Sequence, residues 1–229
     1  MPKRSSSLET AASLIPESPT LDKLREAAAG CRACPLWEKG TQTVFGEQEG
    51  RPRAGPRVMF VGEQPGDQED KAGKPFVGPS GRLLNEALEV VGIDRQQVYV
   101  TNTVKHFKWV ETEGEKRIHA KPSTGEIRAC KPWLEAELRV FRPDVIVCLG
   151  ATAAQALLGK DFRVTKQRGL VLHSEYAPVL VATVHPSSIL RVPEEAGRKA
   201  ALRAFIKDLR VVADVLQRLS AGEEVSAQL

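Results

Sequence analysis

Four polar side chains that could do chemistry stand directly after short apolar segments of this chain. Glu63 and Gln64 follow the first such segment, Asn102 lies near the end of the second, and His185 follows the last. A carboxylate beside an amide, held between glycines, suits a site that hydrogen-bonds a polar ring and steers charge near it. Because the carboxyl ends of parallel strands meet at one edge of a sheet, we expect these side chains to form one site.

Strand-like and helix-like segments alternate along the chain and predict the sheet that would hold this site. The apolar runs are typical of buried strands, and the stretches between them carry apolar residues at helical spacing. Such alternation favours a parallel sheet covered on both faces. The predicted fold is an α/β fold, a three-layer α/β/α sandwich with a central, mostly parallel, four-stranded sheet. Its strands are expected at 58–62, 97–104, 144–150 and 179–184, and its helices at 81–91, 151–158 and 194–219.

The composition is that of a soluble globular protein. The 229 residues are 41% hydrophobic and 27% charged, and no apolar run approaches the length of a membrane span. The net charge of +4 permits nucleic-acid binding without demonstrating it. The basic N-terminus lacks an apolar core behind it, so we expect no secretory signal and a cytoplasmic location. We expect a monomer with one domain at 21–220 and flexible tails at 1–20 and 221–229.

The four cysteines of the chain indicate a metal site. Cys31 and Cys34 form a Cys-x2-Cys pair, which is typical of a metal-binding knuckle or of a redox dithiol. Cys130 and Cys148 are distant in sequence and could complete a tetrathiolate site for zinc or for an iron–sulfur cluster. The spacing alone does not separate these metals. A disulfide scaffold is disfavoured in a chain of this length without a secretory signal.

Several separated motifs resemble those of the uracil-DNA glycosylase superfamily. They are Gly-Glu-Gln-Pro-Gly at 62–66, Pro-Phe-Val-Gly at 75–78, Thr-Asn-Thr-Val-Lys-His-Phe at 101–107 and His-Pro-Ser-Ser at 185–188. In order and spacing they are similar to the iron–sulfur branch, family four and its relatives, over residues 31–216. The resemblance implies uracil-containing DNA, single-stranded or duplex, as the substrate. It also implies a structural [4Fe–4S] cluster on Cys31, Cys34, Cys130 and Cys148.

A polar loop expected at 108–126 narrows the resemblance. An inserted loop ending in Arg-Ile-His, together with Gln64, resembles the group called UdgX within this superfamily. That group usually carries Lys-Arg-Arg-Ile-His, whereas this chain has Glu-Lys-Arg-Ile-His at 115–119. Lys116 keeps a positive charge without the planar fork of arginine. Proteins of this group excise uracil and stay covalently joined to the abasic sugar through the loop histidine, which here is His119.

The resemblance also assigns residues to a uracil flipped out of the DNA stack. Phe76 would stack on the ring, Asn102 would read its Watson–Crick edge, and Gln64 would add polar contacts. The region from Gln64 to Asp67, which contains Gly66, is where we expect the thymine methyl group to be excluded.

The chemistry of the remaining residues suggests a mechanism. His185 is placed to donate a hydrogen bond to a uracil oxygen as negative charge develops there. Neutral His119 can attack C1′ of the sugar, because imidazole is a competent nucleophile, and Glu63 can accept its other N–H. Arg191 could hold a phosphate or brace the His185 turn. The residues expected to contact the DNA backbone are Lys116, Arg117 and Ser187.

Three other hypotheses stay open. An ordinary family-four enzyme would release free abasic DNA, with the loop at 108–126 only touching the strand. A non-catalytic, metal-stapled nucleic-acid-binding module would use the same polar groups only to hold a ligand. A redox protein that uses the Cys-x2-Cys pair would leave Cys130 and Cys148 without a role.

Overall fold

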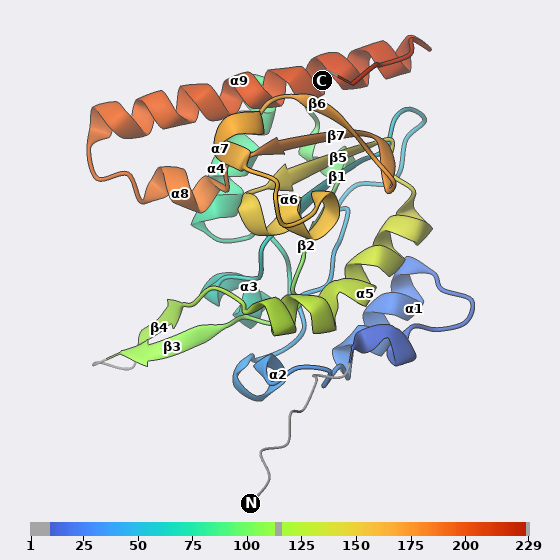
Figure 1. Cartoon of the computed structure of the whole chain (residues 1–229), viewed down its shortest axis with the longest axis vertical. Coiled ribbons are helices and arrows are strands. Elements are labelled where there is room, and N and C mark those ends of the chain that lie inside the picture. The colour runs from blue at the N-terminus through green and yellow to red at the C-terminus, as the bar shows by residue number, and fades with distance from the viewer. Residues whose placement is uncertain (1–9, 113–115, 228–229) are drawn as a thin grey trace, which may run out of the picture.

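The computed structural model describes residues 10–112 and 116–227. At its centre is a five-stranded sheet whose strands lie in the order β2-β1-β5-β7-β6 (Figure 1). The bounds of these strands are β1 Val58–Gly62, β2 Val98–Asn102, β5 Val145–Leu149, β6 Val171–Ser174 and β7 Ala177–Thr183. The first four in spatial order run parallel, and β6 runs antiparallel to β7 at the edge. The predicted parallel sheet is therefore confirmed.

The fifth strand, β6, was not expected from the sequence. It has only four residues, and its pairing with β7 is interrupted by a register shift between Leu172 and Ser174. Only Val171 of this strand is buried, because one side of an edge strand faces solvent. A segment this short and this polar lacks the apolar run that identified the other four strands.

Helices cover both faces of the sheet, as the predicted three-layer sandwich requires. One layer contains α4 (Pro79–Val90), α8 (Pro186–Leu190) and α9 (Glu195–Ser220), and the other contains α5 (Thr124–Phe141), α6 (Ala151–Leu158) and α7 (Val164–Gln167). Alternate strand residues supply the two cores: Phe60 and Val147 pack with Phe205 on α9, whereas Met59 and Ile146 pack with Leu134 on α5. Because both faces are covered, β1, β2 and β5 are buried along their whole length.

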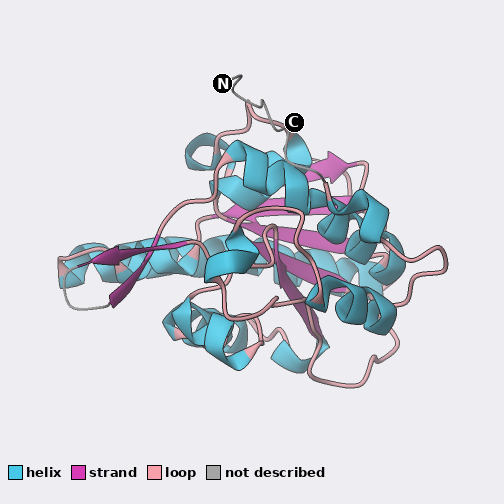
Figure 2. Ribbon diagram, turned by 90° about the horizontal axis from the view of Figure 1, so that it is seen from below, coloured by secondary structure: helices cyan, strands magenta, loops and turns pink. Residues whose placement is uncertain are grey.

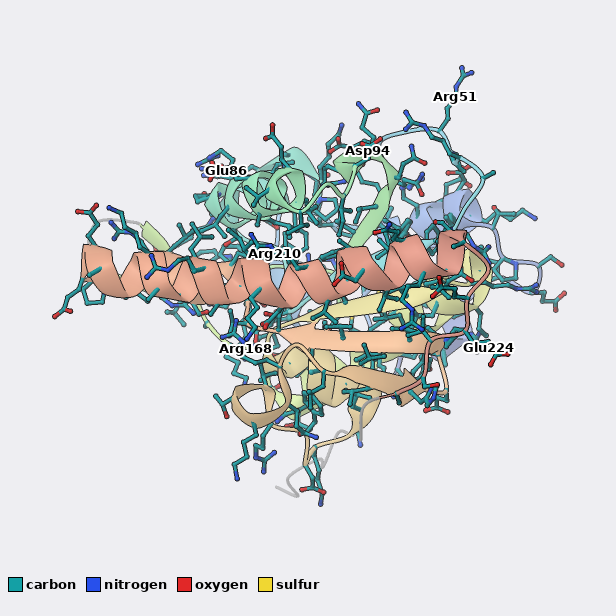
Figure 3. All side chains as sticks on the ribbon, turned by 90° about the horizontal axis from the view of Figure 1, so that it is seen from above. Arg51, Glu86, Asp94, Arg168, Arg210 and Glu224 are labelled. Carbon is teal, nitrogen blue, oxygen red and sulfur yellow. The ribbon has the colours of Figure 1, made fainter. Side chains whose placement is uncertain are left out.

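The long helix α9 is tied to the end of β7, close to His185. In the view of Figure 3 α9 lies across the molecule, with Arg168 beside it next to the sheet. Arg168 donates to Asp208 Oδ2 of α9 over 2.7 Å, and the Thr183 hydroxyl donates to the same oxygen over 2.5 Å. Thr183 is the last residue of β7, so this buried carboxylate fixes the strand end two residues before His185.

The N-terminal segment packs on the sheet through α5. It contains η1 (Ala11–Leu14), α1 (Leu21–Ala29) and α2 (Leu36–Lys39). Ala11 is fully buried in a cluster with Trp133 of α5, and Ile15 packs against the same cluster, so the part of the expected flexible tail around η1 packs on α5. Residues 1–9 of that expected tail lie outside the described residues, as do residues 228–229 of the C-terminal tail. At 221–227, Val225 packs against the core and Glu223 pairs with Arg218 at 3.0 Å.

The expected loop at 108–126 is instead a β-hairpin followed by the start of a helix. The hairpin strands are β3 (Trp109–Thr112) and β4 (Lys116–His119), and Figure 2 shows them extending from the body of the molecule. Trp109 pairs with His119, and Val110 pairs with Ile118. Residues 113–115, including Glu115, lie outside the described residues. After the hairpin, Ser123 and Glu126 form a capping box that begins α5 within the expected loop.

The two remaining short helices complete the layout: α3 (Asp67–Ala72) follows β1, and η2 (Arg95–Gln97) precedes β2. No helix in the described part of the chain is long and apolar enough to cross a membrane.

Candidate functional site

A cavity of about 890 Å³ lies at the carboxyl ends of β1, β2, β5 and β7. All three residues expected to take part in catalysis and all the residues expected to bind the substrate line it. They are Glu63, His119 and His185, and Gln64, Gly66, Asp67, Phe76, Asn102 and Arg191. Ser187 also lines this cavity.

A second cavity, of about 950 Å³, lies at the opposite ends of the strands, near Arg57 and Gln97. Three arginines line it, and each forms an ion pair with an aspartate. The pairs are Arg25 with Asp22 at 2.7 Å, Arg53 with Asp94 at 3.0 Å and Arg57 with Asp144 at 3.8 Å. The arginines of the second cavity are therefore neutralised by aspartates. The first cavity, in contrast, is lined by histidine and glutamate side chains that can take part in catalysis.

Asn102 presents an unused acceptor to the first cavity. Its side chain is buried, and Oδ1 has no hydrogen-bond partner among the described residues. A Cβ atom on Gly62 would overlap this oxygen and approach the ring of Phe76 to 2.8 Å, so glycine is required beside it. A buried acceptor without a partner costs about 1–3 kcal/mol. A ligand that supplies an N–H at this point would recover that cost.

Phe76 is held beside Asn102 in an uncommon backbone conformation. Its φ is +57°, in the left-handed region that non-glycine residues rarely adopt. The carboxylate of Glu69 holds the two chain segments around it, accepting from Gly66 N at 3.1 Å and from Gly78 N at 2.7 Å. Any Cβ on Gly81 would overlap the Phe76 carbonyl. This framework fixes the ring in the wall of the cavity.

His185 is a neutral imidazole with a fixed tautomer. Its Nδ1 accepts from the Ser187 backbone N–H at 3.1 Å and lies 2.8 Å from Ser187 Oγ, so it caps helix α8. Because Nδ1 is an acceptor, the proton of the neutral ring is on Nε2. Burial, together with the charges of His119 and Arg191, lowers the pKa of His185 to about 4. The ring therefore offers one N–H donor at neutral pH.

His119 reaches the cavity from the end of β4 and faces Glu63 of the β1 turn. Its Nε2 lies 3.4 Å from Glu63 Oε1, and its side chain is 46% exposed. Burial and the charge of Arg191 lower the pKa of His119 below 6.5, although Glu63 opposes this shift. The Thr152 hydroxyl of α6 donates to the other oxygen of Glu63. The histidine is therefore neutral at neutral pH, with a carboxylate beside one ring nitrogen.

A family model described as the uracil DNA glycosylase superfamily matches residues 49–210 of this chain. That range includes the whole cavity described above. The chain belongs to the uracil DNA glycosylase superfamily.

Two sequence relatives support the same assignment. A type-4 uracil-DNA glycosylase from Thermotoga maritima is 37% identical over 194 residues, which cover 82% of this chain and 95% of that protein. A type-4 uracil-DNA glycosylase from Sulfurisphaera tokodaii is 36% identical over 182 residues, covering 76% and 77%. Among solved structures, Pedobacter heparinus SMUG2 aligns with a TM-score of 0.47 and 16% identity over 70% of this chain and 77% of that one.

In this superfamily member the amide of Gln64, which lines the cavity, is bonded to the hairpin. Its Oε1 accepts from Lys108 N at 3.1 Å, and its Nε2 donates to the carbonyls of Lys108 at 3.2 Å and Ala120 at 3.1 Å. The side chain is buried and every polar atom of the amide is bonded. Gln64 therefore fixes the base of the hairpin.

Arg117, which is expected to contact a phosphate, is engaged within the protein. It bonds Asp67 Oδ1 at 2.6 Å and Asp70 Oδ2 at 2.7 Å, and it lies over the rings of Phe107 and Trp109. Lys71 and Arg117 lower the pKa of Asp67, whose carboxylate is thus not a free base contact either. Arg117 locks β4 onto α3 and so positions His119 two residues later.

The other residues expected to contact the substrate or the DNA backbone differ in whether their polar groups are already bonded within the protein. The Gly66 N–H donates to Glu69, and the Ser187 N–H and hydroxyl are bonded to His185 Nδ1. Arg191 is exposed at the rim of the cavity. Lys116 begins β4, and its side chain lies outside what the structure describes.

Three of the four cysteines lie together, and Cys148 does not join them. Cys31, Cys34 and Cys130 belong to one buried cluster between the N-terminal segment and α5. Cys148 sits within β5 in the sheet core, where burial alone raises the pKa of its thiol. Its strand therefore places Cys148 in the α5–α6 core, apart from the cluster that contains the other three thiols.

Two of the three clustered sulfurs accept hydrogen bonds from N–H groups. Trp133 Nε1 donates to Cys31 Sγ at 3.3 Å, and Lys105 N donates to Cys130 Sγ at 3.2 Å. Hydrogen bonds to cysteine sulfurs are one of the ways in which proteins tune iron–sulfur clusters. Among the described residues no three His, Cys, Asp or Glu side chains are arranged around one metal ion. His106, which follows Lys105, is buried and approaches the turn at Gly40 after α2.

A buried ion pair connects this cysteine region to Asn102. Lys105 Nζ lies 2.5 Å from Glu137 Oε2 and donates to the Asn102 carbonyl at 2.7 Å, while its backbone N–H bonds Cys130. Sequence reasoning missed this lysine, and it also missed Glu69 and Thr152. Lys105 lies in the motif at 101–107 without an assigned role, and only the fold places the polar atoms of all three residues against the site.

Proposed function

We propose that this chain excises uracil from DNA. The observation that carries the proposal is the buried, unpartnered Asn102 Oδ1 in the cavity beside Phe76. Uracil has an N3–H donor on its Watson–Crick edge that suits this acceptor and a flat ring that suits stacking on an aromatic side chain. A base must leave the duplex stack to reach such a site. Membership of the superfamily and the names of the relatives support this substrate.

Cleavage of the glycosidic bond leaves its electron pair on uracil and makes C1′ electron-poor. The His185 Nε2–H donates to the uracil oxygen where this negative charge develops. Because the His185 ring is neutral, it stabilises the charge on uracil through a hydrogen bond and carries no additional proton on Nδ1. Arg191 at the rim adds a positive charge near the departing anion and the DNA phosphates.

We infer that His119 then captures the sugar. The ring nitrogen that holds its lone pair attacks C1′ and forms the new C–N bond. The proton on the nitrogen that faces Glu63 passes to that carboxylate, so the product is a neutral alkyl-imidazole and free uracil anion. A neutral imidazole bonded to an anomeric carbon is a poor leaving group at neutral pH. The adduct therefore persists, and each protein molecule acts once.

A turnover enzyme is the second candidate, and the relatives favour it. Those described above are named type-4 uracil-DNA glycosylases. In that reaction Glu63 positions a water molecule that attacks C1′, and free abasic DNA leaves. Denaturing electrophoresis of the reaction with uracil-containing DNA separates the two, because only the covalent reaction shifts the DNA band. A protein that releases no uracil at all would be a non-catalytic binding module.

We also propose an iron–sulfur cluster on Cys31, Cys34 and Cys130, with His106 as the fourth ligand. The three clustered thiols and the two N–H donors to their sulfurs support this arrangement. Imidazole replaces thiolate on iron in known clusters. The cluster would hold the N-terminal segment against α5. Its effect on the reaction would be through position, because Lys105 connects Cys130 to Asn102.

A further inference from the structure

Thr152 is the donor that orients the Glu63 carboxylate. It is the second residue of α6 and is 6% exposed. Its hydroxyl donates to Glu63 Oε2, while Glu63 Oε1 lies 3.4 Å from His119 Nε2. Among the described residues, no other side chain donates a hydrogen bond to this carboxylate. The two oxygens thus have separate partners, one fixed in a helix and one on the hairpin.

The position of Thr152 is itself fixed by the fold. Gly150 links β5 to α6 with a φ of +95°, a conformation that favours glycine. Threonine is branched at Cβ and therefore has few rotamers in a helix. Its hydroxyl is consequently a rigid donor, whereas the glutamate it holds is a flexible side chain at the end of a strand.

We propose that Thr152 is a positioning residue for the reaction at C1′. It holds one Glu63 oxygen so that the other faces the N–H of His119 and receives its proton as the carbon–nitrogen bond forms. This inference rests on the proposed function, because it assigns Thr152 to the step in which His119 attacks. Thr152 does not touch the base or the sugar in this account and acts only through Glu63.

The test uses Thr152→Val, which keeps the shape of the side chain and removes the donor, and Thr152→Ser, which keeps the donor. The probe is a uracil-containing single-stranded oligonucleotide under single-turnover conditions. Thr152→Val should slow crosslinking roughly 10- to 100-fold, the value of one hydrogen bond to a charged group. Thr152→Ser should recover most of the rate. The thermal midpoints of all variants should stay near that of the wild type.

Two further readouts separate positioning from a merely structural role. Combined with Glu63→Gln, Thr152→Val should cause little additional loss, since both changes remove the same arrangement. In the DNA-free protein, the ¹⁵N shifts of His119 should show the Nε2-protonated tautomer, and Thr152→Val should shift them towards a mixture. A full additional loss in the double variant, or unchanged ¹⁵N shifts, would overturn the proposal.

If the proposed function is wrong, the rates of crosslinking and uracil release show a different pattern. If the wild type releases uracil without forming an adduct, the covalent step is wrong, and the same variants then report on water positioned by Glu63 through the rate of uracil release. If the wild type crosslinks and Thr152→Val crosslinks equally fast, only the role of Thr152 is wrong. A wild type that neither releases uracil nor crosslinks would overturn both.

Discussion

Gln64 and Lys108 exchange two hydrogen bonds at the base of the hairpin. The Lys108 N–H donates to Gln64 Oε1 at 3.1 Å, and Gln64 Nε2 donates back to the Lys108 carbonyl at 3.2 Å. The same nitrogen also bonds the Ala120 carbonyl at 3.1 Å. The glutamine amide thus joins both strands where they leave the body of the protein. His119 is the residue before Ala120, so this amide determines where the imidazole lies.

Replacing Gln64 by Ala should therefore slow crosslinking more than uracil release. Three hydrogen bonds are lost, and we expect a decrease in the crosslinking rate of about tenfold or more. Uracil release, measured in the His119→Ser background, should change much less. Gln96→Ala is the matched control, because Gln96 is exposed on η2 and does not line the cavity. An equal decrease in both rates would mean that Gln64 contacts the base after all.

Arg117→Gln should impair crosslinking without weakening the phosphate contacts of the protein. The guanidinium is paired with Asp67 and Asp70, and its loss would free β4 from α3. A residue that binds a phosphate lowers the slope of log affinity against log salt by about one when it is removed. We expect Arg117→Gln to leave this slope unchanged. Lys121 is exposed on the cavity rim, so Lys121→Gln provides the comparison. A lower slope for Arg117→Gln alone would restore the role of Arg117 at the DNA backbone.

The sheet could be predicted from the sequence because its strands are buried on both faces. Residues 58–61 and 145–149 are apolar throughout, and such runs leave little choice of structure. The placement of Glu63, Asn102 and His185 at one edge followed from the parallel arrangement. The hairpin could not be predicted in this way, since its strands carry charged residues and its register depends on Gln64, which is 44 residues distant from Lys108.

Site details that depend on tertiary contacts were the ones the sequence could not provide. Arg117 was expected at the DNA because it is a basic residue in a polar segment. Its two carboxylate partners come from α3, nearly 50 residues earlier. Cys148 was assigned to the cluster because the chain has four cysteines, but the count carries no information on which core a strand residue faces. The resemblance identified the superfamily, which the family match confirms.

The pH dependence of His119 should show that the imidazole is neutral when it reacts. Burial and Arg191 lower its pKa below 6.5, so the ring is protonated only under more acidic conditions. Protonated imidazole has no lone pair to attack C1′, and crosslinking should therefore fall as the pH drops through this pKa. An NMR titration of the DNA-free protein should place the His119 midpoint below 6.5. Arg191→Gln should move the midpoint upwards, and a wild-type midpoint above 6.5 would contradict this account.

Metal analysis of cysteine variants should separate the three clustered thiols from the fourth. Cys148→Ser should keep stoichiometric iron and the broad visible absorption of a cluster, because its thiol lies in the sheet core. Cys130→Ser should lose both, and His106→Ala should lose or destabilise the cluster. His106→Cys should restore it. Loss of iron in Cys148→Ser together with full retention in His106→Ala would reverse the assignment of the fourth ligand.

His119→Ser should convert the protein into a turnover enzyme. The pocket around Phe76, Asn102 and His185 is unchanged, so uracil is still bound and the glycosidic bond still broken. Serine is a poor nucleophile without a dedicated base, and its shorter side chain leaves room for water beside Glu63. We expect no crosslink and several uracils released per protein molecule. In Asn102→Ala both activities should be lost. A His119→Ser protein that releases no uracil would show that the histidine is needed for bond cleavage itself.

The central claim, capture of the sugar by His119, is tested most directly by mapping the product. Wild-type protein is incubated with uracil-containing DNA, denatured and separated by electrophoresis, and the shifted band is digested for peptide mass spectrometry. We predict that the abasic sugar is attached to His119, and that DNA of the same sequence without uracil gives no shifted band. Uracil release with no shifted band, or attachment at His106, His173 or His185, would contradict the claim.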